Sequence, residues 1–164
     1  MSILLFGAKY IYLFIIATAV IFFGLQPRER QKNIFVLSVI YLPLAYILAQ
    51  IVAYFYFDPR PFVVGHFQPL IPHAADNGFP SDHMLLSGAI ASILFVYNKK
   101  IGAVSWGIAF FVGLSRVGAG LHHWTDIIGS GLIAVLVMAF VKIYIFPRVV
   151  KMKMYQKFLG HKII

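Results

Sequence analysis

The sequence predicts an all-α integral membrane protein, a polytopic bundle of about five membrane-spanning helices that forms one domain over residues 1–164. Composition is the first reason: 61% of the residues are hydrophobic and only 12% are charged, whereas a soluble domain carries roughly a quarter charged residues. The second is the length of apolar runs such as 11–25 and 34–57, since about 20 helical residues cross a hydrocarbon core. The third is that the basic residues gather in a few clusters between these runs.

The apolar runs define the expected helices in chain order: 3–25, 34–57, 83–97, 101–117 and 125–146. The first run is expected to stay in place as an anchor. It has no basic residue before Lys9, and no small-residue cleavage pattern precedes QPRERQK, so it does not fit a signal peptide. The third and fourth runs are short for a full crossing, which suits tilted helices or a site sunk below the membrane surface.

The positions of the basic residues predict the orientation. The net charge is +9, and three clusters follow the first, third and last runs: Arg28, Arg30 and Lys32; Lys99 and Lys100; Arg148, Lys151, Lys153, Lys157 and Lys162. The positive-inside rule makes all three cytoplasmic, which places the C-terminus inside and the N-terminus outside. Anionic lipid headgroups are the expected partners of the basic tail, and nucleic acid is not expected. The chain has no cysteine, so disulfides and thiolate metal sites are excluded.

Most of the remaining ionisable residues fall on the opposite, outer side of the predicted membrane. They are Asp58, Arg60, His66, His73, Asp76, Asp82, His83, Arg116, His122, His123 and Asp126. Polar groups at a bilayer are costly, so a functional site is the default interpretation. The segment 58–82 is also too long for a plain connection, and its aromatic residues argue against disorder. We therefore expect an extracytoplasmic active-site loop.

Two motifs lie in or beside this loop. DPRPF holds Arg60 between two prolines, which prevent a regular helix from continuing through it. FPSDH precedes the third apolar run, where Ser81 or Asp82 is expected to cap a helix after Pro80. A helix N-terminus at this position favours an anion, and His83 lies beside it.

A third motif, SRVGAGLHHWTD, places Arg116 six residues before His122 and Asp126 four residues after it. If His122 to Asp126 is helical, the two side chains lie on one face, and the carboxylate accepts from one imidazole nitrogen. The other nitrogen is then available as a nucleophile or base. His83 is a candidate donor of a proton to a departing oxygen. Two arginines and a helix N-terminus match the oxygens of a phosphate group.

Each piece also has a structural interpretation when taken alone. Arg60 fits an anchor at the membrane interface, and His122 with Asp126 fits a structural hydrogen-bonded pair. His123 beside Trp124 fits an interfacial belt. The remaining outer residues fit local roles: a turn at Asp76-Asn77-Gly78, a cap or local pair at Asp58, and loop hydrogen bonds at His66 and His73.

The motifs together resemble the three-part signature of the type 2 phosphatidic acid phosphatase (PAP2) superfamily. The matching residues are RP at 60–61, PSDH at 80–83, and SR followed by five residues, His122, three residues and Asp126. The resemblance runs from about 34 to 146. Within the superfamily, FDPRPF, LIPHAADNGFPSDH and LHHWTDIIGS are most similar to the bacitracin-resistance type of undecaprenyl-diphosphate phosphatase.

The resemblance implies a metal-independent phosphatase that needs no cofactor and forms a phosphohistidine intermediate. By position, His122 would attack phosphorus, Asp126 would orient it and His83 would protonate the leaving group. The transferred phosphoryl group would be held by Arg60, Ser81, Arg116 and the backbone N–H of Asp82. In this family type, the reaction recycles the lipid carrier of peptidoglycan biosynthesis at the bacterial plasma membrane and supports bacitracin resistance.

Two departures from the superfamily bear on the substrate. The superfamily has a lysine seven residues before the motif arginine, where this chain has Ala53. It usually has glycine where Asp82 stands, and a carboxylate there repels phosphate unless it turns away, pairs with an arginine or is protonated. Both departures favour a polyprenyl diphosphate as the lipid partner over phosphatidic acid or phosphatidylglycerophosphate, the alternative substrates.

Other classes of function are less favoured. A small transporter or lipid-binding scaffold would use intramembrane histidines and acids as a proton relay, but it would not need two arginines beside a helix N-terminus. Metal-dependent hydrolysis is less expected because the sequence has no HExxH pair and no compact carboxylate cluster. Protein partners are not predicted by any motif.

Overall fold

The computed structural model describes residues 3–159, which form helices joined by loops, with no strand in that range. The helices are α1 (Ile3–Gly24), α2 (Arg28–Phe55), α3 (Pro61–Val64), α4 (Asp82–Tyr97), α5 (Lys99–Gly118), α6 (Trp124–Phe140), the π-helix η1 (Val141–Ile145), α7 (Phe146–Val150) and α8 (Lys153–Leu159). The predicted all-α fold is confirmed. Lys162 and His161 lie outside the described residues.

The main boundary error of the sequence prediction concerns α2, which begins at Arg28 rather than at residue 34. The first basic cluster is therefore helical and not a loop. Arginine, glutamate, glutamine and lysine are all good helix formers, and Glu29 in the first turn suits the positive end of the helix dipole. Pro27 precedes the helix, where its missing N–H is not needed.

Within residues 3–159, four helical stretches are long and apolar enough to cross a membrane: Ile3–Gly24, Arg28–Phe55, Lys99–Gly118 and Trp124–Val150. The remaining predicted crossing, the third in chain order, is the shorter apolar helix α4. Its 16 residues extend about 24 Å at 1.5 Å per residue. Large side chains such as Phe14, Ile47 and Phe110 are exposed on the outer faces of the bundle. Apolar surface on this scale is suited to lipid rather than water, and the chain is a membrane protein.

The short helix α4 lies at the centre of the bundle. It packs against α5 and α6 and also contacts α1 and α2. Small residues make this possible: Ser87, Gly88, Ala89, Ala91 and Ser92 are all buried. A Cβ at Gly88 would come within 3.0 Å of the Trp106 ring, so the glycine is needed for α5 to approach this closely. The core on the other side of α4 joins it to α2 and α6 through residues such as Tyr41 and Val137.

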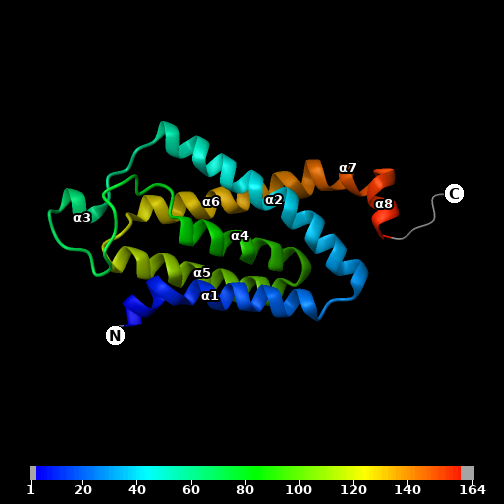
Figure 1. The fold of residues 1–164 in the computed structure, drawn as a ribbon, viewed down its shortest axis with the longest axis horizontal. Coiled ribbons are helices and arrows are strands. Elements are labelled where there is room, and N and C mark those ends of the chain that lie inside the picture. The colour runs from blue at the N-terminus through cyan, green and yellow to red at the C-terminus, as the bar shows by residue number, and fades with distance from the viewer. Residues whose placement is uncertain (1–2, 160–164) are drawn as a thin grey trace.

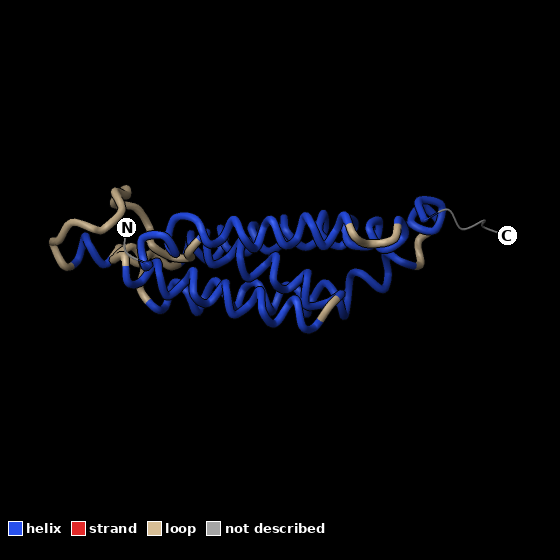
Figure 2. Tube along the Cα trace, turned by 90° about the horizontal axis from the view of Figure 1, so that it is seen from below, coloured by secondary structure: helices blue, strands red, loops and turns tan. Residues whose placement is uncertain are grey.

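The two ends of the bundle differ in chemistry. Figure 1 shows α3 and the long loop at one end, with the α1–α2 turn, the α4–α5 turn, α7 and α8 at the other, and Figure 2 shows the corresponding concentration of loops at the α3 end. The predicted basic clusters follow α1, α4 and the last span, so they share the α7–α8 end. Arg30 donates to the Tyr97 carbonyl (2.7 Å) and Lys32 to the Phe158 carbonyl (2.7 Å), which ties the clusters together.

Candidate active site

The long loop is fastened to the bundle at the α3 end by Asn77. Its side-chain oxygen accepts from the backbone N–H of Asp58 (2.9 Å), and its amide nitrogen donates to the carbonyls of Ala53 (3.1 Å) and Tyr56 (3.0 Å). Gly78 N–H also donates to the Asp58 carbonyl (2.8 Å). The loop is therefore bound to the end of α2. At Ala53, it is the backbone carbonyl that anchors the loop.

His122 lies at the meeting point of this loop with the α5–α6 connection, and it is only 2% exposed. Its Nδ1 is 2.9 Å from the Gly78 carbonyl oxygen and 3.2 Å from Asp126 Oδ2. Both partners only accept hydrogen bonds, so Nδ1 carries the proton. Nε2 lies 3.3 Å from a terminal nitrogen of Arg60 and 3.4 Å from one of Arg116, so its lone pair faces two donors.

The environment of His122 favours a neutral ring. Burial lowers the pKa of the imidazole, the hydrogen bond to Asp126 raises it, and the charges of Arg116 and Arg60 lower it again. The net result is a pKa below the ordinary value of 6.5. A neutral ring protonated at Nδ1 leaves Nε2 as a free nucleophile or base, oriented toward the two guanidinium groups.

The pair is not formed in the way that the spacing suggested. His122 precedes α6, which begins at Trp124, so the two residues are not successive turns of one helix. Asp126 is in the first turn of α6 and reaches back, and its Oδ2 also accepts from the backbone N–H of His123 (2.9 Å). The contact between His122 and Asp126 is present, but the assumption that His122 is helical is wrong. Asp126 is completely buried.

Arg60 is held by groups on three sides. Its Nε donates to Asp76 Oδ1 (2.6 Å) and one terminal nitrogen to the Leu121 carbonyl (2.9 Å), while the other lies 3.4 Å from the Asn77 carbonyl. The arginine is 5% exposed, so it is part of a buried site and not an interface anchor. The flanking prolines leave Arg60 as the extended residue before α3, which lets the side chain turn toward His122.

Arg116 comes from the last turn of α5 and is also 5% exposed. One of its terminal nitrogens is 3.4 Å from the Ala8 carbonyl of α1, and its Nε is buried with no hydrogen-bond partner among the described residues. Two buried guanidinium groups thus converge on one imidazole nitrogen. Such a position attracts an anion with several oxygens, and it opposes a divalent cation at Nε2. Within residues 3–159, no three His, Asp or Glu side chains are placed to hold a metal ion together.

Ser81 occupies the predicted cap position before α4, but its side chain makes no capping hydrogen bond. The capping prediction is therefore wrong for both candidates, because Asp82 is already the first residue of the helix. Ser81 is fully buried, and its hydroxyl oxygen has no partner in the described part of the chain. A buried hydroxyl without a partner is costly in a finished core. It is available to a ligand.

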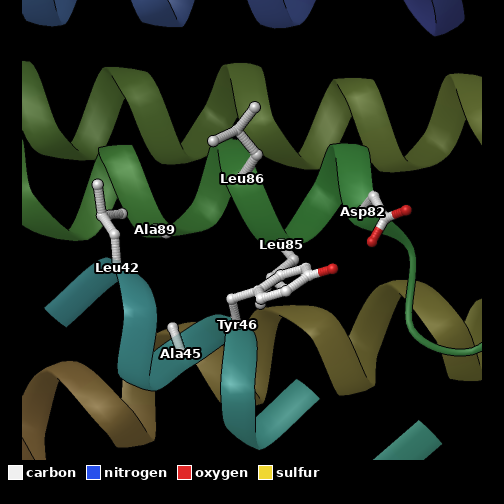
Figure 3. A pocket seen from close by; sticks show the side chains of 7 residues that line it. All are labelled: Leu42, Ala45, Tyr46, Asp82, Leu85, Leu86 and Ala89. Carbon is white, nitrogen blue, oxygen red and sulfur yellow. The ribbon is translucent and has the colours of Figure 1, made fainter. Parts of the chain in front are cut away.

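The Asp82 carboxylate is exposed and lines a crevice between α2 and α4 (Figure 3). The crevice has a volume of about 340 Å³ and apolar walls that include Leu42, Ala45 and Leu85. Within residues 3–159, no ion pair joins the Asp82 carboxylate to an arginine. The predicted proton donor His83 is partly buried and presents an edge-to-face contact to Tyr12, with ring centroids 4.9 Å apart. None of the hydrogen bonds of the described residues joins it to His122.

Two residues of the site were missed by sequence reasoning, which interpreted the segment containing them as a plain turn. Gly78 supplies the second acceptor for His122, and a Cβ there would lie 3.0 Å from the Asp58 carbonyl and 3.1 Å from Asp126 Oδ2. Asp76 pairs with Arg60 and lies 4.0 Å from His73 Nδ1. Two signals were available: Asp76 is one of the outer ionisable residues, and both residues lie just before PSDH.

Two residues near the site hold the loop rather than the reacting groups. His123 Nε2 lies 3.1 Å from the Pro59 carbonyl, and the Thr125 hydroxyl donates to Asp58 Oδ2 (2.9 Å). The interpretation of His123 as part of an interfacial belt is therefore incomplete, because its ring fastens the start of α6 to the loop. For Trp124, which is 45% exposed, the interpretation as part of an interfacial belt still applies.

We expect Asp76→Ala to raise KM about 3–10-fold with a smaller change in kcat, because Asp76 positions Arg60 by its Nε and does not touch His122. The effect is limited because the Asp76 side chain is 58% exposed and water screens the pair. Asp76→Asn keeps an acceptor for Nε and should recover part of the loss. Steady-state kinetics on a phosphorylated lipid measure both constants.

Asp58→Asn is the matched control, since Asp58 bonds to Thr125 and not to an arginine. A larger rise in KM for Asp58→Asn than for Asp76→Ala would contradict the assignment of Asp76 as the residue that positions Arg60.

Comparison with known proteins shows related sequences. The family model described as the PAP2 superfamily matches residues 34–149. The chain is 33% identical over 142 residues to the undecaprenyl-diphosphatase BcrC of Bacillus subtilis (strain 168), covering 83% of this chain and 70% of that protein. It is 32% identical over 137 residues to the bacitracin transport permease protein BcrC of Bacillus licheniformis, covering 83% of this chain and 67% of that protein. No solved structure matches the chain significantly.

Proposed function

The chain belongs to the PAP2 superfamily, and we propose that it hydrolyses a polyprenyl diphosphate, with undecaprenyl diphosphate as the physiological substrate, to the monophosphate and inorganic phosphate. The observation that carries this proposal is the placement of His122 Nε2 against two buried arginines, with Nδ1 held by two acceptors. That arrangement suits a nucleophile for phosphorus. The monophosphate product is the lipid carrier that peptidoglycan biosynthesis reuses.

In the proposed first step, Nε2 attacks the terminal phosphorus. The N–P bond forms while the bond from phosphorus to the bridging oxygen breaks, and the leaving polyprenyl monophosphate takes its proton from His83. This step requires His83 to be protonated when the substrate is bound, and the negative charge of the diphosphate favours that state by offsetting the charge of Arg116. Arg60, Arg116, the Ser81 hydroxyl and the backbone N–H of Asp82 hold the oxygens of the transferred group, where negative charge is concentrated. Asp126 keeps the His122 ring oriented and stabilises the charge that the ring acquires.

In the second step, water attacks the phosphorus of the phosphohistidine from the side that the leaving group has vacated. His83, now neutral, accepts the proton from this water, and the N–P bond breaks to return the electron pair to Nε2. Inorganic phosphate is released and the histidines return to their starting states. The residues at the site supply every group that these two steps require, so we propose that no metal ion takes part.

The crevice between α2 and α4 supports a lipid substrate. Asp82, the residue after Ser81, lies at one end of this crevice, and the apolar wall runs along α4 through Leu85 and Ala89 (Figure 3). A diphosphate bound at the N-terminus of α4 would have an apolar surface within reach of its hydrocarbon chain. This arrangement is expected for a membrane lipid and would serve no purpose for a soluble phosphate ester.

The substrate is tested by measuring phosphate release from undecaprenyl diphosphate and from phosphatidic acid by the purified protein in detergent with EDTA present. We expect turnover of the diphosphate that resists the chelator, with a kcat/KM at least about tenfold above that for phosphatidic acid. Preference for phosphatidic acid would overturn the substrate and keep the mechanism. Loss of activity with EDTA would overturn metal independence. If neither lipid is hydrolysed, a transport function becomes the better proposal, as in the name of the permease protein of Bacillus licheniformis.

We further propose that the α3 end of the bundle faces outside and that the α7–α8 end is cytoplasmic. The support is that the described residues of the three basic clusters gather at the α7–α8 end, as the positive-inside rule requires. Alkaline phosphatase and green fluorescent protein fused after Ile164 test this orientation in bacteria. Fluorescence without phosphatase activity is expected, and the reverse result would overturn it.

A further inference from the structure

A second crevice lies at the end of the bundle away from His122. It is bordered by α4, α5, α6 and η1, and it has a volume of about 370 Å³. Trp106, Val135 and Met138 form part of its apolar wall, and the ammonium-bearing side chains of Lys99 and Lys142 line it as well. Lys99 begins α5 and Lys142 belongs to η1, so two separate elements each bring one positive charge to the same opening. Neither lysine has a part in the proposed reaction.

The setting of Lys142 is unusual for a structural lysine. It falls within the last candidate span, Trp124–Val150, in a π-helical turn that interrupts the α-helix. Ionisable residues in membrane spans are costly and mark functional positions, and single π-helical turns are frequent at functional sites. Lys142 Nζ lies 5.2 Å from the centre of the Phe146 ring, and Lys99 Nζ lies 4.0 Å from that of Phe95. Across residues 3–159, no carboxylate forms an ion pair with either lysine.

We propose that this crevice binds an anionic phospholipid of the membrane leaflet opposite the catalytic site. The phosphate group lies between Lys99 and Lys142, and one acyl chain lies along the apolar wall beside Trp106. The two positive charges select a negative headgroup, and the apolar wall selects a molecule with a hydrocarbon chain. A soluble anion would use the lysines and leave the wall uncovered.

The position of the crevice is consistent with entry from the bilayer. Neighbouring side chains of the same helices, Val104, Leu136 and Phe140, are 65%, 62% and 53% exposed, which marks the surrounding surface as facing lipid. Each lysine near an anionic lipid surface increases binding about fivefold, so the pair should favour an anionic over a zwitterionic lipid by roughly 25-fold.

Trp106 provides a direct probe, because a brominated acyl chain in contact with an indole quenches its fluorescence. The chain has two tryptophans, and Trp124→Phe leaves Trp106 as the single reporter. The full-length protein would be placed in nanodiscs of unlabelled phosphatidylcholine with increasing fractions of brominated phosphatidylglycerol or brominated phosphatidylcholine. We expect half-maximal quenching at about a 25-fold lower fraction of the anionic lipid than of the zwitterionic one.

Matched charge variants then separate the crevice from general surface charge. Lys99→Gln with Lys142→Gln should remove the preference, and Lys99→Arg with Lys142→Arg should keep it. Lys100→Gln with Lys151→Gln removes the same charge at the same end of the bundle, but neither residue lines the crevice. The preference is the ratio of the zwitterionic to the anionic lipid fraction at half-maximal quenching. The control pair should retain at least half of the logarithm of the ratio measured without these two substitutions.

Three results would overturn the proposal: equal quenching by the two lipids, an equal loss of preference in the control pair, or reversal of quenching by millimolar inorganic phosphate. The last result would indicate a soluble anion in place of a lipid. Fluorescence is measured without substrate, so these outcomes do not depend on phosphatase activity, and failure of one proposal leaves the other intact.

Discussion

Replacing His122 with alanine is expected to lower kcat for phosphate release by about 10⁴-fold or more, because it removes the Nε2 atom that both Arg60 and Arg116 face. The residual rate would come from binding and from charge stabilisation by the arginines. Substrate labelled with ³²P in its terminal phosphate gives a second measurement. The wild-type protein should trap the label in an acid-labile, alkali-stable bond, as expected for phosphohistidine, and the variant should trap none.

The control for this prediction is His66→Asn. His66 is an exposed loop residue with a positive φ of 51°, a backbone conformation that asparagine tolerates. Its kcat should stay within about threefold of wild type, the range of small surface changes. If His122→Ala retains a labelled intermediate, or if its kcat falls no more than that of His66→Asn, another residue is the nucleophile.

The second large effect is expected for Asp126→Asn, with kcat lowered about 10²–10⁴-fold. Asp126 Oδ2 accepts from both His122 Nδ1 and His123 N–H, so an amide oxygen at this position keeps both contacts but removes the negative charge that stabilises the ring when it becomes positively charged. The Gly78 carbonyl also accepts from Nδ1, at 2.9 Å, and it still holds the ring with its proton on Nδ1 in the variant. The loss should therefore be smaller than for His122→Ala.

The pH profile shows whether Asp126 acts through the ring of His122. The wild-type pKa of His122 lies below 6.5, so kcat/KM should hold as the pH falls through 6.5 and decline only at lower pH, where the ring becomes protonated. The Asp126 hydrogen bond raises that pKa, so the Asn variant should move the acid limb to still lower pH. An acid limb that moves to higher pH would contradict this role for Asp126.

The sequence predicted the bundle well because membrane spans depend on local hydropathy. Apolar runs located the helices, and the basic clusters that separate them proved to share one end of the bundle. Reliance on hydropathy also explains why the start of α2 was missed. Residues 28–33 are polar and were interpreted as lying outside the helix, although residues of these types favour helix formation.

The candidate site was predicted less completely. The motif spacing brought Arg60, Arg116, His122 and Asp126 together, as the structure does, but the condition that 122–126 is helical does not hold, because α6 begins two residues after His122. It also made Ser81 a cap, whereas the buried hydroxyl makes no capping hydrogen bond. Spacing along the chain does not distinguish one extended residue before a helix from its first turn, and that difference decides where the side chains point.

By itself, the sequence determined that this protein lies in a membrane and which few ionisable residues could perform chemistry, because hydropathy and residue type are properties of the chain. Only the tertiary structure decided that the Gly78 carbonyl accepts the hydrogen bond from His122 Nδ1, that Asp76 holds Arg60, and that Asp82 lines the crevice between α2 and α4. Each of these features depends on the path of the long loop or on the direction of one side chain. No local pattern specifies either, because both result from packing between segments that are distant in the chain.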